Sequence, residues 1–188
     1  MKYHRLGVLG GMGPAASAEF MVRLAQQTPA RVDQDHIPTI LWSDPRIPDR
    51  SESVRRGTDE PLPLLLEGIR GLKAAGCNNI VIPCNTAHFW FSQLAKEDVY
   101  IVHIVDSVAA QLRELNVPKK PIGVMGTKGT IELGLYQYHL NRQGWDCKVP
   151  SPEDMNQYVQ PGIDMVKAGH IKDAYERSEE HTSELQSH

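Results

Sequence analysis

The sequence predicts an α/β fold with two pseudo-symmetric lobes, each a parallel sheet flanked by helices, and with the second lobe incomplete. Short apolar runs of β type alternate with helical segments along the chain, which is typical of parallel sheets. The pattern then restarts, because residues 121–126 repeat the strand-then-glycine form of residues 6–11. We therefore expect a first lobe at residues 1–104 and a second lobe at residues 105–176.

The first lobe contains four predicted strands and three predicted helices. The strands are residues 6–10, 37–42, 79–83 and 100–104, and the helices are residues 14–27, residues 61–75 and a segment through Phe89 and Leu94. Pro14 suits the first turn of a helix, because its missing N–H would lack a partner there in any case. Gly76 is a typical residue to end the second helix.

The second lobe is expected to open with a helix at residues 106–115. A strand at residues 121–126, a helix at residues 130–141 and a helical region at residues 151–167 follow it. The strand at residues 121–126 and the helix after it repeat the first strand and first helix of the first lobe, which is why we expect the two lobes to resemble each other.

The last segment, residues 177–188, does not fit this pattern. It is polar throughout, lacks a stripe that could face a core, and resembles a translated sequencing adapter. We expect it to be non-native and native sequence to stop near Glu176, so that the second lobe lacks at least one strand–helix unit. The alternative is an ordinary disordered tail.

Composition narrows the classes of partner. The 188 residues carry a net charge of −3 with both signs interspersed, which gives no basic stripe for nucleic acid and no membrane-binding segment. Three cysteines, an odd number in a chain without a signal peptide, indicate reduced thiols and a cytoplasmic protein. A small molecule is therefore the expected partner.

Cys84 is the first candidate catalytic residue. It follows the apolar run of residues 80–82, and ligands of parallel sheets bind beyond the carboxyl ends of the strands. A helix beginning near Asn85 would stabilise a thiolate through its free N–H groups and dipole. The alternative is a buried structural cysteine.

Two glycine-rich turns resemble nucleotide-binding motifs without matching them. Gly11 and Gly13 satisfy a loose dinucleotide fingerprint, but Pro14 removes an N–H that a pyrophosphate would need. Glycine follows Lys128 where a phosphate loop has serine or threonine, so the segment 126–130 is not a Walker A motif. Both turns could instead bring backbone N–H groups close to a small carboxylate.

Polar pairs accompany these turns. Asn85 and Thr86 follow Cys84, and Thr127 and Thr130 lie in the corresponding turn of the second lobe, where they could hold a carboxylate or cap helices, with Thr130 as the N-cap.

Two further pairs have a functional and a structural interpretation each. Asp49 and Arg50 could bind a substrate carboxylate or form a surface ion pair. Cys84 and His88 are four residues apart and would share a helix face, which could indicate metal ligands or a Cys-His nucleophile pair. No second ligand pair accompanies them, so no metal site is expected.

Four motifs together resemble the aspartate/glutamate racemase family, and most closely its aspartate racemases. They are Leu9-Gly10-Gly11-Met12-Gly13-Pro14, Ile47-Pro48-Asp49-Arg50, Pro83-Cys84-Asn85-Thr86-Ala87-His88 and Gly126-Thr127-Lys128-Gly129-Thr130. The resemblance implies two α/β lobes, cofactor-independent inversion of an acidic amino acid by two cysteines, and a homodimer. It implies neither pyridoxal phosphate nor a metal.

The resemblance also implies roles for particular residues. Cys84 is the expected acid/base of the first lobe. The residues expected to contact substrate are Met12, Gly13, Asp49, Arg50, Asn85, Thr86, Thr127, Thr130 and Lys167. Of these, Asn85 and Thr86 in the first lobe, and their counterparts Thr127 and Thr130 in the second, would hold the α-carboxylate. Arg50 would hold the side-chain carboxylate.

The chain departs from the family in one motif. The partner cysteine lies in a Gly-Cys-Thr-Glu segment in this family, and no cysteine follows Cys147, which itself lacks that context. We therefore expect the parent protein to be an amino-acid racemase and this form to be inactive. The alternatives are a maleate isomerase or malonate decarboxylase of the same fold, or a silent binding protein for small acids.

Overall fold

A computed structural model describes residues 5–176 of the chain. The chain divides into two compact units between Leu115 and Asn116, later than the boundary expected at residue 104. The helix that begins at Ile104 belongs to the first unit, because the Ile104 N–H donates to Nε2 of His88 there at 3.2 Å. The two units are described separately below.

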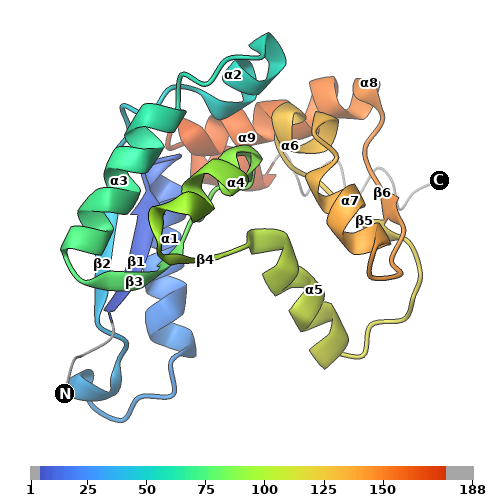
Figure 1. Cartoon of the computed structure of the whole chain (residues 1–188). Coiled ribbons are helices and arrows are strands. Elements are labelled where there is room, and N and C mark those ends of the chain that lie inside the picture. The colour runs from blue at the N-terminus through green and yellow to red at the C-terminus, as the bar shows by residue number, and fades with distance from the viewer. Residues whose placement is uncertain (1–4, 177–188) are drawn as a thin grey trace. The chain divides into compact units, whose positions relative to one another are not determined.

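A four-stranded parallel sheet organises the first unit and confirms the predicted α/β fold (Figure 1). Its strand order is β2-β1-β3-β4, with β1 at Arg5–Gly10, β2 at Thr39–Ser43, β3 at Cys77–Val81 and β4 at Tyr100–Val102. The central strand β1 pairs in parallel with both β2 and β3. Val8 and Leu9 are fully buried, as expected of a strand covered on both faces.

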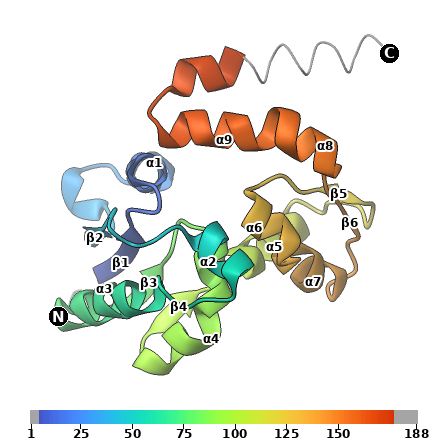
Figure 2. The ribbon, with the colours of Figure 1, turned by 90° about the horizontal axis from the view of Figure 1, so that it is seen from above.

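Helices cover both faces of this sheet. The α-helices are α1 (Pro14–Gln27), α2 (Arg50–Arg56), α3 (Leu62–Ala74), α4 (Phe91–Leu94) and α5 (Ile104–Glu114), and the 3₁₀ turns are η1 (Asp33–Asp35), η2 (Thr86–Trp90) and η3 (Ala95–Glu97). Helices α1 and α3 lie on opposite faces (Figure 2). This follows from right-handed crossovers that leave β1 toward β2 and then return past β1 to β3.

The predicted strands and helices of this unit are confirmed in order, with one helix added. Helix α1 has the predicted bounds, whereas α2 was not predicted from the proline-rich segment that precedes it. Asp49 caps α2 by accepting a hydrogen bond from the Glu52 N–H at 2.8 Å, and Gly57 ends it with φ of 66°. Both residues are ordinary helix signals, so the sequence does contain a pattern for this helix.

Two glycines let α3 approach the sheet closely. A Cβ atom on Gly71 would lie 2.3 Å from the ring of Trp42 on β2, and one on Gly68 would lie 2.4 Å from Cδ1 of Leu9. The backbone of α3 thus packs directly against side chains of β1 and β2.

The second unit has a smaller parallel sheet. Strand β5 (Ile122–Gly123) pairs with β6 (Cys147–Lys148), and the helices are α6 (Lys128–Glu132), α7 (Leu135–Asn141), α8 (Pro152–Asp154), the π-helical turn η4 (Met155–Val159) and α9 (Gln160–Lys167). Helix α7 lies beside β6 (Figure 1). Lys119 Nζ lies 2.8 Å from the ring centroid of the buried Trp145, which anchors the start of this unit to its core.

Two predictions for the second unit were wrong. The strand expected at residues 121–126 has only two residues, and the helix expected at residues 130–141 is interrupted at Gly134, which has φ of 63°. β6 was not predicted. The incompleteness of this unit stays a prediction, and the tail at residues 177–188 lies outside the described residues.

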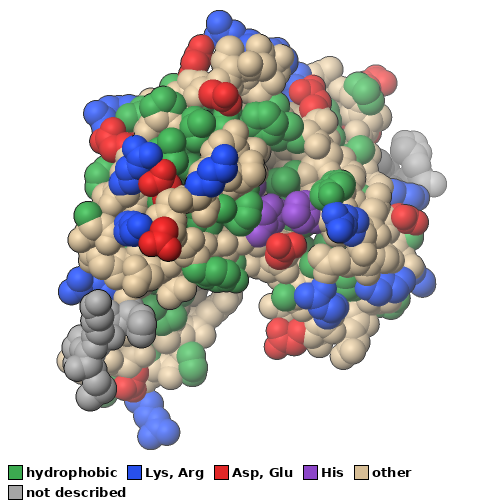
Figure 3. Space-filling view, viewed as in Figure 1, with side chains coloured by type: hydrophobic (Ala, Val, Ile, Leu, Met, Phe, Trp, Pro, Cys, Tyr) green, Lys and Arg blue, Asp and Glu red, His purple; other side chains and the backbone are tan. Residues whose placement is uncertain are grey.

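The distribution of surface charge and the lengths of the helices show which kinds of binding partner the described residues could contact. Acidic and basic side chains are mixed over the face shown in Figure 3. Within residues 5–176, no helix combines the length and the apolar character that crossing a bilayer requires.

The close approach of α3 to β2 leads to a stability prediction. Alanine usually stabilises a helix relative to glycine by up to about 1 kcal/mol. Gly71→Ala should instead lower the free energy of unfolding by about 1–3 kcal/mol, because the new methyl group overlaps the Trp42 ring. Urea unfolding of the wild type and the variant measures this.

The control is the same substitution in a Trp42→Ala background. With the ring removed, Gly71→Ala should become neutral or stabilising. An equal loss of stability in both backgrounds would contradict the assigned contact.

Candidate functional site

The candidate site lies at the carboxyl ends of β1 and β3. These neighbouring strands lead away from the sheet in opposite directions, since β1 connects to β2 on one side and β3 to β4 on the other. Parallel α/β sheets bind ligands at this topological switch point. The segments that follow the two strands begin at Gly11 and Ile82, so both predicted turns of the first unit meet at this edge.

The turn after β1 is held by a short set of contacts. Gly11 has φ of +91°, and a Cβ atom there would lie 2.4 Å from the backbone of Asp44. Its N–H donates to Ser17 Oγ at 2.9 Å, and that hydroxyl donates to the Gly13 carbonyl at 3.0 Å. Ser17 is buried in the first turn of α1, so it ties the start of this helix to the turn.

Met12 and Gly13 differ in their surroundings. Met12 is buried within the main hydrophobic cluster, which gives it a packing role. Gly13 is the N-cap residue of α1 with φ of −99°, and a Cβ atom there would contact nothing within 4 Å. Open space at this backbone position is compatible with the predicted approach of a ligand.

Cys84 lies three residues beyond β3, in a tight turn. Its N–H donates to the Ile82 carbonyl at 2.7 Å, which closes a three-residue turn around Pro83. The side chain is half-buried and packs against the same cluster that contains Met12. Asn85 is half-buried and Thr86 is buried directly after it.

The helix expected near Asn85 is a 3₁₀ turn. η2 spans five residues and α4 only four more, so no long helix dipole points at the thiol. His88 lies in this turn and its Nδ1 is 2.9 Å from the carbonyl oxygen of Cys84. The predicted Cys84–His88 pair therefore meets through the cysteine backbone.

Arg50 is held with its guanidinium partly inside the protein. Its NH1 group donates to the carbonyls of Ile47 at 3.1 Å and Pro48 at 3.0 Å. Within the described chain, its buried Nε has no hydrogen-bond partner. Helix α2, which begins at Arg50, packs against η2, so Arg50 belongs to an element that contacts the turn after Cys84.

Asp49 caps α2 rather than pointing into the protein. It is exposed, and its carboxylate accepts from the Glu52 N–H. The structure thus gives Asp49 a helix-capping role and Arg50 a half-buried position.

Asp44 and Ser17 border the candidate site, and neither was expected there from the sequence. Asp44 is buried and accepts from Arg46 Nε at 2.9 Å and from Arg46 NH2 at 2.8 Å. These side-chain hydrogen bonds hold the pKa of Asp44 below its usual value. The segment Asp44-Pro45-Arg46 directly after a strand is the one sequence signal for the contact between Asp44 and Arg46.

The second unit holds the other predicted contacts. Thr127 caps α6, accepting from the Thr130 N–H at 3.3 Å, and the two hydroxyl oxygens are 3.1 Å apart. The N-cap is therefore Thr127, not Thr130, which is buried inside the helix. Lys167 is exposed at the end of α9, about 10 Å along the helix from Gln160, the residue that contacts α6.

The other two thiols lie in different settings. Cys77 is fully buried at the start of β3, the opposite end of that strand from Cys84, and burial raises the pKa of its thiol. Burial and the nearby Asp146 raise the pKa of Cys147. Neither environment favours a thiolate.

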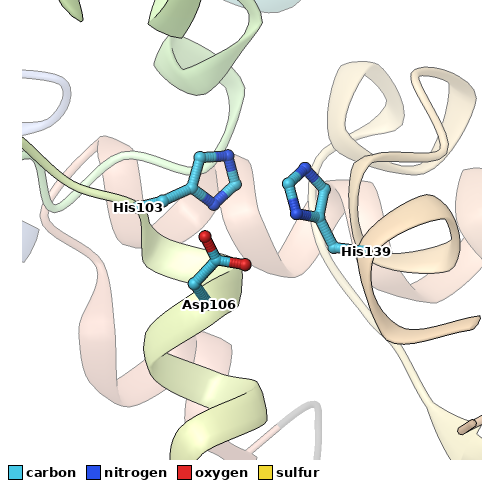
Figure 4. A group of neighbouring side chains, drawn as sticks. All are labelled: His103, Asp106 and His139. Carbon is cyan, nitrogen blue, oxygen red and sulfur yellow. The ribbon is translucent and has the colours of Figure 1, made fainter. Parts of the chain in front are cut away.

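Two side chains of the kinds that bind metal ions, His103 and Asp106, are neighbours at the start of α5. The Asp106 carboxylate faces the ring of His103 (Figure 4), with possible ligand atoms within 4.8 Å. Two ligands are fewer than the three or four of a zinc site. Among the described residues of the first unit, no three His, Cys, Asp or Glu side chains lie close enough together to hold a metal ion. His103 and Asp106 alone therefore do not form a zinc site.

The fold and this edge define a class of protein: a parallel α/β protein with a thiol at the switch point of its sheet. The model of the Asp/Glu/Hydantoin racemase family matches residues 9–187 of the chain. The chain belongs to this family, which confirms the resemblance seen in the four motifs. The matched range also continues past Glu176, where native sequence was expected to end.

Individual relatives agree with this assignment. The chain is 28% identical over 144 residues to the broad specificity amino-acid racemase RacX of Bacillus subtilis, covering 74% of this chain and 61% of that protein. The chain thus spans less than two thirds of the length of this curated relative.

Solved structures show the same relationship. The aspartate racemase of Picrophilus torridus matches with a TM-score of 0.79 and 32% identity, over 94% of this chain and 73% of that one. A putative Asp/Glu racemase from Yersinia pestis matches with a TM-score of 0.72 and 25% identity, over 93% and 78% of the two chains.

The geometry of the turn after β1 predicts different tolerances at two neighbouring glycines. Gly11→Ala should lower the free energy of unfolding by at least about 2 kcal/mol, because φ is positive and the methyl group meets backbone. Gly13→Ala serves as the matched control and should leave stability within about 1 kcal/mol of the wild type. Chemical denaturation measures both, and similar losses in the two variants would contradict the assigned geometry.

Proposed function

We propose that this chain carries half of the acid/base machinery of a cofactor-independent racemase for an acidic amino acid. Membership of the racemase family supports the reaction class. The observation that carries the proposal is the position of Cys84, a half-buried thiol beyond β3 at the topological switch point. Cys77 and Cys147 lie in environments that disfavour a thiolate.

The chemistry requires two groups on opposite faces of the substrate Cα. One thiolate removes the α-proton and a thiol on the other face returns a proton, so the two exchange roles between the enantiomers. Negative charge then spreads onto the α-carboxylate and must be stabilised by hydrogen-bond donors. In this proposal Cys84 is one of the two groups, and Asn85 and Thr86 bind the α-carboxylate.

Arg50 is the proposed ligand of the side-chain carboxylate. Its NH1 group is engaged by two backbone carbonyls, which fixes the guanidinium, while its Nε has no hydrogen-bond partner in residues 5–176. A guanidinium whose orientation is already fixed loses little side-chain entropy when it binds a planar carboxylate. This favours aspartate or glutamate over neutral amino acids as substrate.

The proposal is tested by exchange of the α-proton in deuterated water. L- and D-aspartate and glutamate are incubated with the 188-residue chain and with the complete product of the native gene, and ¹H NMR follows the α-proton. We expect inversion by the complete product and its loss in Cys84→Ser. The 188-residue chain should not invert, since no cysteine follows Cys147.

Two results would contradict the proposal. Inversion that persists in Cys84→Ser would remove Cys84 from the mechanism. A folded complete product that acts on neither aspartate nor glutamate would remove the substrate class, and maleate or a malonate would be the next compound to test.

The role of Arg50 predicts weaker substrate binding when its charge is removed. Aspartate should slow alkylation of Cys84 by iodoacetamide, and Arg50→Gln should raise the aspartate concentration needed by about 10- to 100-fold, as expected for a lost charged hydrogen bond. Arg55→Gln on the same helix is the control, because Arg55 is exposed and paired with Glu52. Equal protection in both variants would exclude Arg50 from binding.

A further inference from the structure

His88 joins three parts of the first unit at one side chain. It is 3% exposed and lies in η2, four residues after Cys84. Its Nδ1 is 2.9 Å from the Cys84 carbonyl oxygen, and its Nε2 is 3.2 Å from the N–H of Ile104. The same imidazole therefore contacts the turn after β3 and the start of α5.

The two contacts determine the tautomer of the ring. A backbone N–H can only donate, so the Ile104 N–H requires a lone pair on Nε2. A carbonyl oxygen can only accept a hydrogen bond. Nδ1 therefore carries the proton and donates a hydrogen bond to the Cys84 carbonyl. His88 is therefore neutral, with both ring nitrogens used in fixed directions.

The ring plane is fixed by aromatic neighbours. Phe91 stacks on His88 with 10° between the rings and 6.1 Å between their centroids. His103 meets the same ring edge-on at 5.0 Å and 72°. His103 also precedes Ile104 directly, so the packing and the hydrogen bond hold the start of α5 together.

The contact with α5 satisfies a helix end. Ile104 is the first residue of α5, and the first N–H groups of a helix have no partner within the helix. The contact with Cys84 fixes a carbonyl that adjoins the thiol residue. Because the Cys84 N–H is already bound to Ile82, both peptide groups that flank the Cys84 Cα atom are held.

We propose that His88 is a positioning residue, which holds the Cys84 backbone through its Nδ1–H and thereby sets the direction of the catalytic thiol. This inference rests on the proposed function, in which Cys84 is an acid/base group. His88 does not contact the reacting atoms in this proposal, and its effect passes through the Cys84 carbonyl.

Two substitutions separate the contacts of His88. The amide nitrogen of asparagine can take the place of Nδ1, so His88→Asn keeps a donor for Cys84 and loses the acceptor for Ile104. The longer His88→Gln side chain can place an oxygen near the position of Nε2, so it keeps the acceptor for Ile104 and loses the donor for Cys84.

The readout is the pH profile of Cys84 alkylation by iodoacetamide, followed by peptide mass spectrometry in the full 188-residue chain. His88→Gln should raise the Cys84 rate at least about threefold, because the half-buried thiol is no longer held in its turn. His88→Asn should stay within about twofold of the wild type while its melting temperature falls through loss of the α5 cap. Cys147, in the second unit, is the internal reference.

Ser107→Ala is the control for simple loosening of α5, because it removes the hydrogen bond from Ser107 Oγ to the His103 carbonyl and leaves His88 intact. It should not change the Cys84 profile. The inference is overturned if His88→Gln leaves that profile unchanged, or if all three variants change it equally. Alkylation requires no substrate, so its outcome does not depend on racemase activity. A folded complete gene product that inverts neither aspartate nor glutamate would contradict the proposed function and would leave this test decisive on its own.

Discussion

The structure of the first unit depends on the burial of β1 between two parallel neighbours. The segment that follows β1 passes beside the segment that follows β2, where the Asp44 N–H donates to the Gly10 carbonyl at 3.4 Å. Gly11 makes the turn after β1 with positive φ, in direct contact with the backbone of Asp44. The start of α1, the loop that leads to Arg50 and the edge that carries Cys84 all follow from this packing.

Cys84 is held by backbone contacts more than by a long helix. Its N–H and its carbonyl are both bound, the first by Ile82 and the second by His88. Hydrogen bonds of this kind fix the direction of the Cα–Cβ bond, from which the thiol extends. In the proposed mechanism, this keeps the thiol that exchanges a proton with the substrate at a fixed position.

The sequence predicted the strands and helices of the first unit better than those of the second. β1 and α1 have strong local signals, namely a buried apolar run and Pro14 at a helix start. α2 was missed although Asp49 and Gly57 mark its ends, because the proline-rich segment before it favours a loop. In the second unit Gly134 interrupts a helical pattern, and β6 is too short for a periodicity to develop.

The sequence by itself determined the class of fold and the family, since both depend on local patterns and motifs that are read in order along the chain. It also predicted Cys84 as a candidate site residue, because a thiol after a buried strand reaches the ligand edge in any parallel sheet. Only the tertiary structure decided that Asp44 packs on Gly11, that Arg50 is fixed by two carbonyls and that His88 joins Cys84 to α5. These contacts link residues whose partners are set by the packing of strands and helices, and no local pattern encodes that packing.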